Sequence, residues 1–460
     1  MQKRQADVVI IGAGTAGMTA YRAATRAGKK AILVEGGAFG TTCARVGCMP
    51  SKLLIAAADA AHQAQHTSAF GVHVDGTVRI DGKQVMQRVK SERDRFVSFV
   101  LSDVEAFPAD DKVVGYAKFL DDQTVQVDEH TQIQAQSFVI ATGSTSFIPK
   151  ALLAAGDRLV INDDVFEWED LPQRIVVVGA GVIGLELGQA LSRLGVKTTL
   201  LNRSDTVGGI TDPEVREAAR AAFCCEFALE ANATVTATEL KDNQVVVHYE
   251  QNGQTHHVTA DFVLSAAGRI PNVQGLGLEN TSAELDEKGM PLFDTETLQI
   301  KNTAIFIAGD ANNQHPILHE AADDGYQSGM NAAHWPQAPV AVARRAPMGI
   351  VFTDPQIMKV GCAYKDLDLA RTQIGEVNFA NQGRARVMLK NCGRLRVYAD
   401  KENGRFLGAE MLGPAAEHMA HLLAWCLQME LTIEQMLAMP FYHPVLEEGL
   451  RTALRGARVE

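Results

Sequence analysis

The chain has 460 residues, of which 46% are hydrophobic and 21% charged, and its formal net charge is −12 at pH 7. This length predicts two to four domains with ample apolar core. The acidic balance argues against nucleic-acid or anionic-membrane partners, and no apolar stretch approaches the roughly 18 residues that span a membrane. The N-terminus carries no recognisable secretory signal, so we expect a cytoplasmic protein.

A dinucleotide-binding pattern opens the chain. The short apolar run Ala6–Ile11 predicts a buried strand, a glycine-rich turn and a helical stretch follow, and a second apolar run, Ala31–Val34, ends at an acid. In this pattern the glycines shape the turn, the helix N-terminus faces a pyrophosphate, and the acid binds a ribose hydroxyl. The residues expected to bind the first dinucleotide are Gly12, Gly14, Gly17 and Glu35.

The same pattern recurs further along the chain, with strand Arg174–Val178, helix Leu185–Leu194 and strand Val196–Leu201. Two copies predict two dinucleotides, one strongly held and one exchangeable. Asn202 replaces the acid and Arg203 follows it. An acid here favours NAD and an arginine accommodates NADP, so the coenzyme stays open. The residues expected to bind the second dinucleotide are Gly179, Gly181, Gly184, Asn202 and Arg203.

Between and after the two copies, short strands are expected in Lys112–Asp128, and apolar runs lead into turns at Phe138–Ser144 and Phe262–Asn272. The run Ala304–Asp310 is a strand that ends in a carboxylate, a position that reaches the ligand crevice of parallel sheets. Further cofactor-binding candidates are Ala117, Thr142, Gly143, Gly268 and Asp310.

The character of the sequence changes near residue 346. Antiparallel strands are expected at Gly349–Asp354, Glu376–Ala380, Arg384–Leu389, Leu395–Ala399 and Phe406–Leu412, before a helix at Ala415–Glu430. We therefore predict an α/β protein with two Rossmann-like domains and a C-terminal α+β domain. The predicted boundaries are 1–150 and 272–345 for the first dinucleotide-binding domain, 151–271 for the second, and 346–460 for the last.

Two cysteines, Cys43 and Cys48, lie five residues apart, shortly after the first dinucleotide-binding pattern. Five residues of helix rise about 7.5 Å, whereas the Cα atoms of a disulfide lie roughly 4.4–6.8 Å apart. A redox disulfide therefore requires a bend, which Gly40, Gly47 and Pro50 make possible. A regular helix is expected to begin near Met49, and its positive end favours the Cys48 thiolate.

The other five cysteines are scattered, which does not resemble a secreted disulfide framework. Cys224 and Cys225 are adjacent within the helical run Glu214–Phe227. Zinc ligands are usually spaced by two to four residues and matched by a second pair. We therefore expect no metal site and predict two buried cysteines here.

Together these stretches resemble the flavoprotein pyridine nucleotide–disulfide oxidoreductases, and within that family the dihydrolipoamide dehydrogenases. The resemblance implies FAD at the first glycine turn, NAD or NADP at the second, and a homodimer formed by the C-terminal domain. It rests on both glycine turns and on Cys43–Lys52, Ala141–Gly143, Gly268–Arg269, Gly309–Asp310, Phe352–Pro355 and His443–Glu448.

The resemblance also implies residue roles. Cys43 is the thiol that exchanges with substrate, and Cys48 faces the flavin. Lys52 lies near the flavin and pairs with Glu186, which directly follows the second glycine turn. These groups imply electron transfer between a dithiol such as lipoamide and NAD(P), in cell redox homeostasis or within a 2-oxoacid dehydrogenase complex.

His443 is implied to be the base that serves the disulfide of the other subunit, with Glu448 orienting it. Imidazole titrates near neutrality and a carboxylate partner raises its basicity. Some members carry a second histidine two places earlier, where this chain has Phe441.

Other readings stay open. Arg203 without an acid at position 202 is compatible with a glutathione-type reductase, although no second arginine follows in 204–210. Mercuric reductases usually end in a cysteine pair, which this C-terminus lacks, and soluble transhydrogenases lack the redox pair. The protein could also be a flavoprotein whose main role is assembly in a 2-oxoacid dehydrogenase complex.

Overall fold

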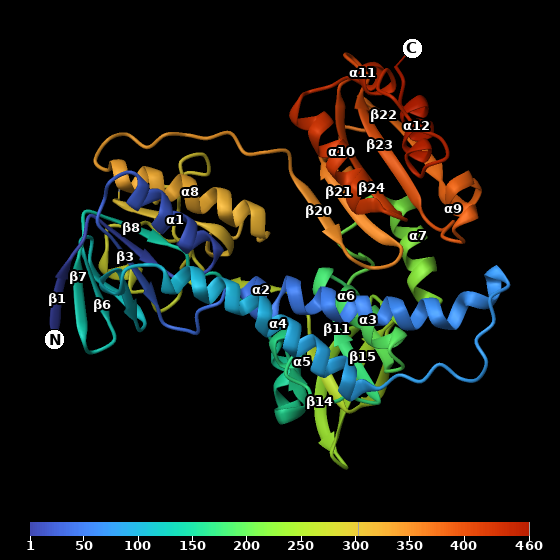
Figure 1. The fold of residues 1–460 in the computed structure, drawn as a ribbon, viewed down its shortest axis with the longest axis horizontal. Helices are drawn as coiled ribbons and strands as arrows, with labels where there is room; N and C mark the ends of the chain where they lie inside the picture. The colour runs from blue at the N-terminus through green and yellow to red at the C-terminus, as the bar shows by residue number, and fades with distance from the viewer. Residues whose placement is uncertain (302, 460) are drawn as a thin grey trace. The chain divides into compact units, whose positions relative to one another are not determined.

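The computed structural model describes residues 1–301 and 303–459, which form two compact units (Figure 1). The first unit contains Met1–Pro50, Lys90–Phe147 and Arg269–Arg344, and the second contains Ser51–Val89, Ile148–Gly268 and Arg345–Glu460. Each unit carries one glycine-rich turn. Within the described ranges, none of the helices combines the length and the apolar character needed to cross a bilayer.

The first unit is built on a five-stranded parallel sheet with the strand order β19-β8-β2-β3-β4. Its strands are β2 (Val8–Ile11), β3 (Ala31–Glu35), β4 (Lys112–Val114), β8 (Ser137–Ile140) and β19 (Ile305–Ile307). All four residues of the central strand β2 are buried, as the apolar run predicts. Since parallel strands end at one edge, Glu35 and the segment after Ile307 lie along the same edge of the sheet.

Helices α1 (Thr15–Arg26) and α8 (Leu318–His334) lie side by side over this sheet (Figure 1). The close packing of α1 against α8 depends on two glycines of α8. A Cβ atom at Gly325 would lie 2.2 Å from the carbonyl oxygen of Ala16, and one at Gly329 would lie 2.5 Å from that of Ala20. Because glycine has no Cβ, the two backbones approach closely enough to cover the sheet together.

Smaller elements complete the first unit. A four-stranded mixed sheet has the order β1 (Gln2–Gln5), β7 (Thr131–Gln134), β6 (Thr124–Val127) and β5 (Ala117–Asp121). Strand β1 pairs with β7 in parallel, and the other pairs are antiparallel. A two-stranded ribbon contains β9 (Ser144–Ser146) and β18 (Arg269–Pro271). Between β3 and β4, helix α2 (Thr42–Val46) belongs to the first unit, whereas α3 (Cys48–His66) continues into the second unit and α4 (Gly82–Glu105) begins there and ends in the first.

The second unit repeats the parallel architecture with the order β10-β17-β11-β12-β13. The strands are β10 (Leu159–Val160), β11 (Arg174–Val178), β12 (Lys197–Asn202), β13 (Ala228–Ala231) and β17 (Phe262–Ser265). Its helices are α5 (Asn162–Val165), α6 (Val182–Arg193) and α7 (Pro213–Cys224). An antiparallel sheet of β14 (Thr234–Lys241), β15 (Gln244–Gln251) and β16 (Gln254–Ala260) belongs to the same unit.

The C-terminal part of the second unit is an antiparallel sheet with the order β20-β21-β24-β23-β22. Helix α10 lies beside β21 and β24 (Figure 1). The strands are β20 (Met348–Val351), β21 (Gln356–Gly361), β22 (Thr372–Asn378), β23 (Arg394–Asp400) and β24 (Phe406–Gly413). The helices are α9 (Gly383–Val387), α10 (Ala416–Gln428), α11 (Ile433–Leu437) and α12 (Glu447–Gly456).

Two expectations for this sheet were wrong. The segment Arg384–Leu389 contains helix α9 and not a strand, because the Gln382 side chain accepts the Ala385 N–H at 2.6 Å and caps a helical turn. Strand β21 was not expected. It follows Pro355 and contains the polar Lys359, so its sequence does not show an uninterrupted apolar alternation.

The expectation that Cys224 and Cys225 are buried was also wrong, since both are exposed. Helix α7 buries Val215, Ala219 and Phe223, which recur every four residues on one face. The two cysteines follow at the helix end and lie off that face. The apolar stripe of α7 therefore ends one residue before them.

A buried ionic cluster joins α7 to the C-terminal sheet within the second unit. Asp212, which is 0% exposed, receives two hydrogen bonds from the Arg396 guanidinium, each 2.9 Å long, and one of 2.9 Å from the Tyr398 hydroxyl. Its Oδ1 also accepts the N–H groups of Glu214 and Val215 and so caps α7. Burial, with the nearby carboxylates, raises the pKa of Tyr398 and keeps its hydroxyl protonated as a donor.

We predict that Asp212→Asn lowers the free energy of unfolding by about 3 kcal/mol, because Arg396 loses its buried counter-charge. Asparagine is itself a good helix cap, so the change isolates the charge. The matched control Glu214→Gln removes a solvent-exposed partner of Arg394 and should change stability by about 1 kcal/mol or less. Urea unfolding of both variants measures the difference, and equal effects would contradict the prediction.

Candidate active site

The chain bends between the two cysteines of the predicted redox pair. Helix α2 ends at Val46, Gly47 has non-helical dihedral angles of φ −126° and ψ −114°, and α3 begins at Cys48. A Cβ atom at Gly47 would lie 3.0 Å from the Thr42 carbonyl oxygen and 3.3 Å from the Cys43 Cα atom. The predicted bend is therefore confirmed, and a side chain at its apex would pack tightly against Thr42 and Cys43.

Cys48 is the first residue of α3, one place before the predicted start of the helix. Its side chain is solvent-exposed and that of Cys43 is half-buried. The first turn of α3 contains Pro50 and no acidic residue, so the positive end of the helix is not neutralised locally. Lys52 lies four residues further along the same helix.

Lys52 and Glu186 form an ion pair within the second unit, with the Nζ and Oε2 atoms 2.7 Å apart. The Glu186 side chain, on α6, is only 4% exposed, and its other oxygen accepts the Phe352 N–H at 3.0 Å. The Lys52 ammonium also lies 4.5 Å from the centre of the Phe352 ring. Burial is tolerated because both carboxylate oxygens are paired. Sequence reasoning placed Phe352 in a family stretch but did not connect it to Lys52.

His443 and Glu448 are brought together at the C-terminus. The Nδ1 atom of His443 lies 3.0 Å and 3.1 Å from the two carboxylate oxygens of Glu448. The hydrogen bond with His443, followed by that from the Val445 N–H, lowers the pKa of Glu448 and keeps it ionised. The His443 side chain is 80% exposed, so its second ring nitrogen is accessible. This geometry suits a base whose orientation is set by a carboxylate.

The first glycine turn has the shape that a pyrophosphate requires. A Cβ atom at Gly17 would lie 1.8 Å from the Gly12 carbonyl oxygen, so the helix packs directly on the turn. At Gly14 a Cβ atom would meet nothing within 4 Å. Helix α1 begins there with no side-chain cap and no acid in its first turn. Open space beside an uncapped helix N-terminus fits the anionic centre of FAD.

The second glycine turn repeats this geometry. A Cβ atom at Gly179 would lie 2.3 Å from the Ala266 carbonyl oxygen, and one at Gly184 would lie 1.9 Å from the Gly179 carbonyl oxygen. Nothing lies within 4 Å at Gly181, where α6 begins without a side-chain cap or an acid in its first turn. The same chemistry therefore fits the pyrophosphate of a nicotinamide coenzyme.

The surroundings of the two glycine turns differ at the residue that ends the next strand, which is Glu35 in β3 and Asn202 in β12. Glu35 accepts the Ala13 N–H at 2.6 Å and the Gly37 N–H at 2.7 Å. In the second copy, Asn202 accepts the Ala180 N–H at 3.2 Å through its amide oxygen. Both residues thus support the glycine turn, but only the first brings a negative charge. Arg203, the next residue, is exposed.

Asp310 lies in a short network at the end of β19. It accepts a 2.7 Å hydrogen bond from the Ser144 hydroxyl, which in turn accepts one of 2.7 Å from Arg269 Nε. Thr142 donates to the Asn272 carbonyl oxygen at 2.6 Å, and Asn272 returns a bond to the Thr142 carbonyl oxygen. Sequence reasoning missed Ser144 and Asn272 as partners, although both lie in turns that it had singled out.

The remaining candidates lie in backbone positions. Gly143 and Gly268 have positive φ angles of 68° and 125°, which favour glycine. Ala117 is buried at the start of β5, where only its backbone could contact a ligand. The structure therefore positions these three residues without showing a side-chain role.

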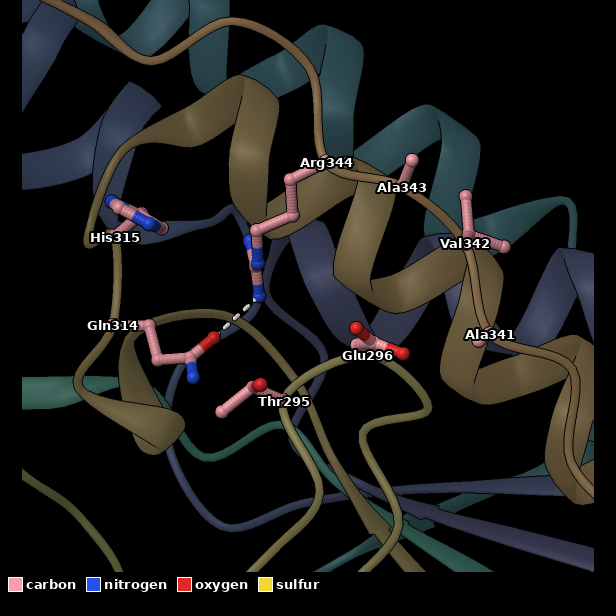
Figure 2. A pocket seen from close by; sticks show the side chains of 8 residues that line it. All are labelled: Thr295, Glu296, Gln314, His315, Ala341, Val342, Ala343 and Arg344. Atoms are coloured by element: carbon pink, nitrogen blue, oxygen red, sulfur yellow. Dashed lines mark hydrogen bonds between the residues drawn. The ribbon is translucent and has the colours of Figure 1, made fainter. Parts of the chain in front are cut away.

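A cavity of about 600 Å³ in the first unit was not expected from the sequence (Figure 2). Arg344 points into it and donates to Gln314 at 2.7 Å, while it also bonds Glu320 at 2.8 Å and Asp324 at 3.0 Å. Burial raises the pKa of Asp324, and the Arg344 charge opposes that rise. Because its guanidinium bonds three side chains, Arg344 anchors the segment before β20. The lining residues are Thr295, Glu296, Gln314, His315, Ala341, Val342, Ala343 and Arg344.

A disulfide oxidoreductase that uses two dinucleotides would need pyrophosphate-shaped turns, a bend between its redox cysteines and an oriented base, and the geometry fits each of these requirements. The comparisons give the same class. The chain belongs to the pyridine nucleotide-disulphide oxidoreductases, whose main family matches residues 6–334 and whose dimerisation domain matches residues 348–454. It is accordingly an NAD(P)-linked flavoprotein oxidoreductase that acts on sulfur groups and uses FAD. The expected α/β fold with a C-terminal dimerisation domain is confirmed.

Similar proteins span almost the whole chain. The dihydrolipoyl dehydrogenase of Haloferax volcanii is 29% identical, and the alignment covers 98% of this chain and 96% of that protein. The dihydrolipoyl dehydrogenase of Geobacillus stearothermophilus is 30% identical, with 96% and 94% covered. The structure of the HOCl-induced flavoprotein disulfide reductase from Escherichia coli has a TM-score of 0.83 at 23% identity, covering 98% of this chain and 99% of that one. At this identity, that structure supports the fold alone.

The contrasting glycines give a matched pair of variants. We predict that Gly14→Ala folds but binds FAD at least about tenfold more weakly, because the methyl group occupies the space beside the uncapped helix end. Gly17→Ala should instead destabilise the fold, since its Cβ atom would overlap the Gly12 carbonyl oxygen. Flavin fluorescence and circular dichroism distinguish the two outcomes. Normal flavin affinity in Gly14→Ala would contradict the assignment.

Proposed function

We propose that the chain is a dihydrolipoamide dehydrogenase that oxidises a dithiol with Cys43 and Cys48 as its redox disulfide. The observation that carries this proposal is the bend at Gly47, which separates the cysteines into two helices and folds the chain back on Cys43. A bent pair of cysteines beside a dinucleotide turn is suited to reversible disulfide formation.

The reaction balances as two consecutive thiol–disulfide exchanges. A substrate dithiol R(SH)2 and the Cys43–Cys48 disulfide yield the oxidised substrate and two protein thiols. In the first exchange, an S–S bond forms between the substrate and Cys43 while the Cys43–Cys48 bond breaks, and Cys48 leaves as a thiolate at the N-terminus of α3. In the second, the other substrate thiol attacks the substrate sulfur of this mixed disulfide, which closes the oxidised substrate and releases the Cys43 thiol. Bound FAD supplies two-electron transfer between the reduced pair and the nicotinamide.

His443 is proposed to take the proton of the attacking substrate thiol. The Glu448 carboxylate holds the imidazole by Nδ1 and leaves Nε2 to act as the base. The dimerisation domain supports a homodimer, in which the histidine of one subunit serves the disulfide of the other. Lys52 and Glu186 are proposed to position the flavin side of the site.

Two relatives support lipoamide as the dithiol, free or carried by a 2-oxoacid dehydrogenase complex, because the proteins from Haloferax volcanii and Geobacillus stearothermophilus are dihydrolipoyl dehydrogenases that align along almost their full length. Asn202 and Arg203 favour a coenzyme site that admits NADP as well as NAD, since no carboxylate stands at position 202 to repel a 2′-phosphate. We propose a cytoplasmic location for this activity.

The proposal is tested by reducing the flavin of the purified holoenzyme with NADH and with NADPH, and then offering lipoamide and oxidised glutathione in turn. We predict turnover of lipoamide and none of glutathione disulfide, with measurable reduction by both coenzymes. Turnover of glutathione disulfide with NADPH alone would favour the glutathione-type reductase. Absence of turnover with both acceptors would refute the substrate assignment.

We predict that His443→Gln lowers kcat for dihydrolipoamide oxidation by roughly 100-fold or more, because the substrate thiol loses its base. Glu448→Gln should lower it by a smaller factor, since the imidazole remains but loses its orienting charge. Stopped-flow reduction of the flavin by NADH provides the control, and it should proceed in both variants. Unchanged kcat in His443→Gln would exclude this histidine as the base.

A further inference from the structure

Helix α6 of the second unit carries a stripe of buried polar side chains. Glu186, Gln189 and Arg193 are exposed by only 4%, 4% and 7%. They are three and four residues apart, so they lie along one face of the helix. Glu186 pairs with Lys52, as described above. Because buried polar groups are costly unless they are bonded, the partners of the other two side chains show what this stripe holds in place.

Arg193 joins three segments of the second unit. Its Nη1 atom lies 2.8 Å from Oδ1 of Asp59 on α3. Its Nε and Nη2 atoms bond the two carboxylate oxygens of Glu226, each at 2.8 Å. Nη2 also donates to the Asp354 carbonyl oxygen at 2.9 Å. One guanidinium therefore ties α3 to the residues after α7 and to the connection between β20 and β21.

The connection between β20 and β21 is bonded to α6 through its backbone. Gln189 accepts the Asp354 N–H at 2.9 Å and donates to the Asp354 carbonyl oxygen at 2.8 Å. Glu186 accepts the Phe352 N–H at 3.0 Å. The partners that hold Arg193 on the side of α6 are thus themselves fixed, and Arg193 is not free to follow a movement of α3.

Two ion pairs join α3 to α6 at the same spacing. Lys52 and Asp59 are seven residues apart on α3, and Glu186 and Arg193 are seven residues apart on α6. Seven residues make almost two turns of helix, so each pair of side chains is only about 20° apart around its axis. The rise over seven residues is about 10.5 Å. The two ion pairs therefore lie along one line of contact between the helices.

The two ion pairs have opposite polarity. Helix α3 contributes the cation to the first pair and the anion to the second. A shift of α3 by one turn would separate both pairs, and a shift by two turns would place Lys52 against Arg193. Complementary charges of this kind fix the register of paired helices. The Asp59–Arg193 pair therefore sets where Lys52 stands along α6.

We propose that Asp59 and Arg193 are positioning residues that hold α3 in the register in which Lys52 serves the flavin, a role that rests on the proposed place of Lys52 at the flavin. Reduction adds two electrons and one proton to FAD and leaves a negative charge on the ring. An ammonium held beside the ring stabilises that charge. A displaced or loosened Lys52 therefore makes the flavin harder to reduce.

The variant Asp59→Asn separates positioning from simple electrostatics by the sign of its effect. Loss of a negative charge from the protein favours a negatively charged reduced flavin, and so eases flavin reduction. Loss of the register of Lys52 hinders flavin reduction. Asparagine has almost the shape of aspartate, and the Asp59 side chain is 40% exposed, so the fold should tolerate the change.

The test measures the equilibrium constant for flavin reduction in the purified holoenzyme, anaerobically and against a reference dye. Every sample carries Cys43→Ser and Cys48→Ser, so that the redox pair takes up no electrons. Lys52→Gln, which keeps a donor for Glu186, should lower the constant by about tenfold, or about 30 mV for two electrons. Asp59→Asn should lower it by about threefold, and the Lys52→Gln/Asp59→Asn double variant should match Lys52→Gln alone.

Asp205→Asn is the matched control. The Asp205 side chain is 42% exposed and forms a 3.1 Å ion pair with Arg216 of α7, in the same unit. Its replacement removes the same charge without touching the register of α3, so the constant should not fall. Flavin content and circular dichroism verify that each variant is folded. If Asp59→Asn does not fold, Asp59→Ser carries the same prediction.

The possible results distinguish the positioning role from the proposed function. If Lys52→Gln lowers the constant while Asp59→Asn raises it or leaves it unchanged, the positioning role is wrong and the proposed function stands. Losses that add in the double variant would also overturn the positioning role, since Asp59 would then act independently of Lys52. An unchanged constant in Lys52→Gln would refute the place of Lys52 at the flavin, and the positioning role with it.

Discussion

The break in the helix at Gly47 is the constraint on which the proposed redox centre depends. An unbroken helix would separate Cys43 and Cys48 by about 7.5 Å along its axis. The structure solves this by ending α2 and starting α3 within one residue. The same break gives Cys48 the first position of a helix and places Lys52 one turn later. One backbone feature thus provides the bend that the proposed disulfide requires and places Cys48 at a helix N-terminus, where a thiolate is favoured.

The sequence allowed the dinucleotide turns and the cysteine bend to be predicted because both are local. At Gly17 and Gly184 the backbone of a helix touches the backbone of its own turn, and a spacing of a few residues is enough to reveal this. The Lys52–Glu186 pair joins distant segments and has no local signal, so it was accessible only through family resemblance. The contact of Phe352 with both residues became visible only in the structure.

The two kinds of incorrect prediction, of a strand and of buried cysteines, share a physical origin. Arg384–Leu389 alternates like a strand, but a single side-chain cap from Gln382 converts it to a helical turn. Cysteine is commonly buried, yet Cys224 and Cys225 lie beyond the point where the apolar face of α7 ends. Composition describes the average environment of a residue, whereas these outcomes depend on where an element stops.

Glu35 and Asn202 occupy equivalent positions beside the two glycine turns, so they can be compared within one chain. Each accepts the N–H of the alanine inside its glycine turn, one as an anion at 2.6 Å and the other as a neutral amide at 3.2 Å. The turn therefore folds with or without the charge. A substitution at position 202 can therefore add or remove a charge beside the second turn while the scaffold is preserved, and the duplicated architecture leaves Glu35 in the first turn unaffected.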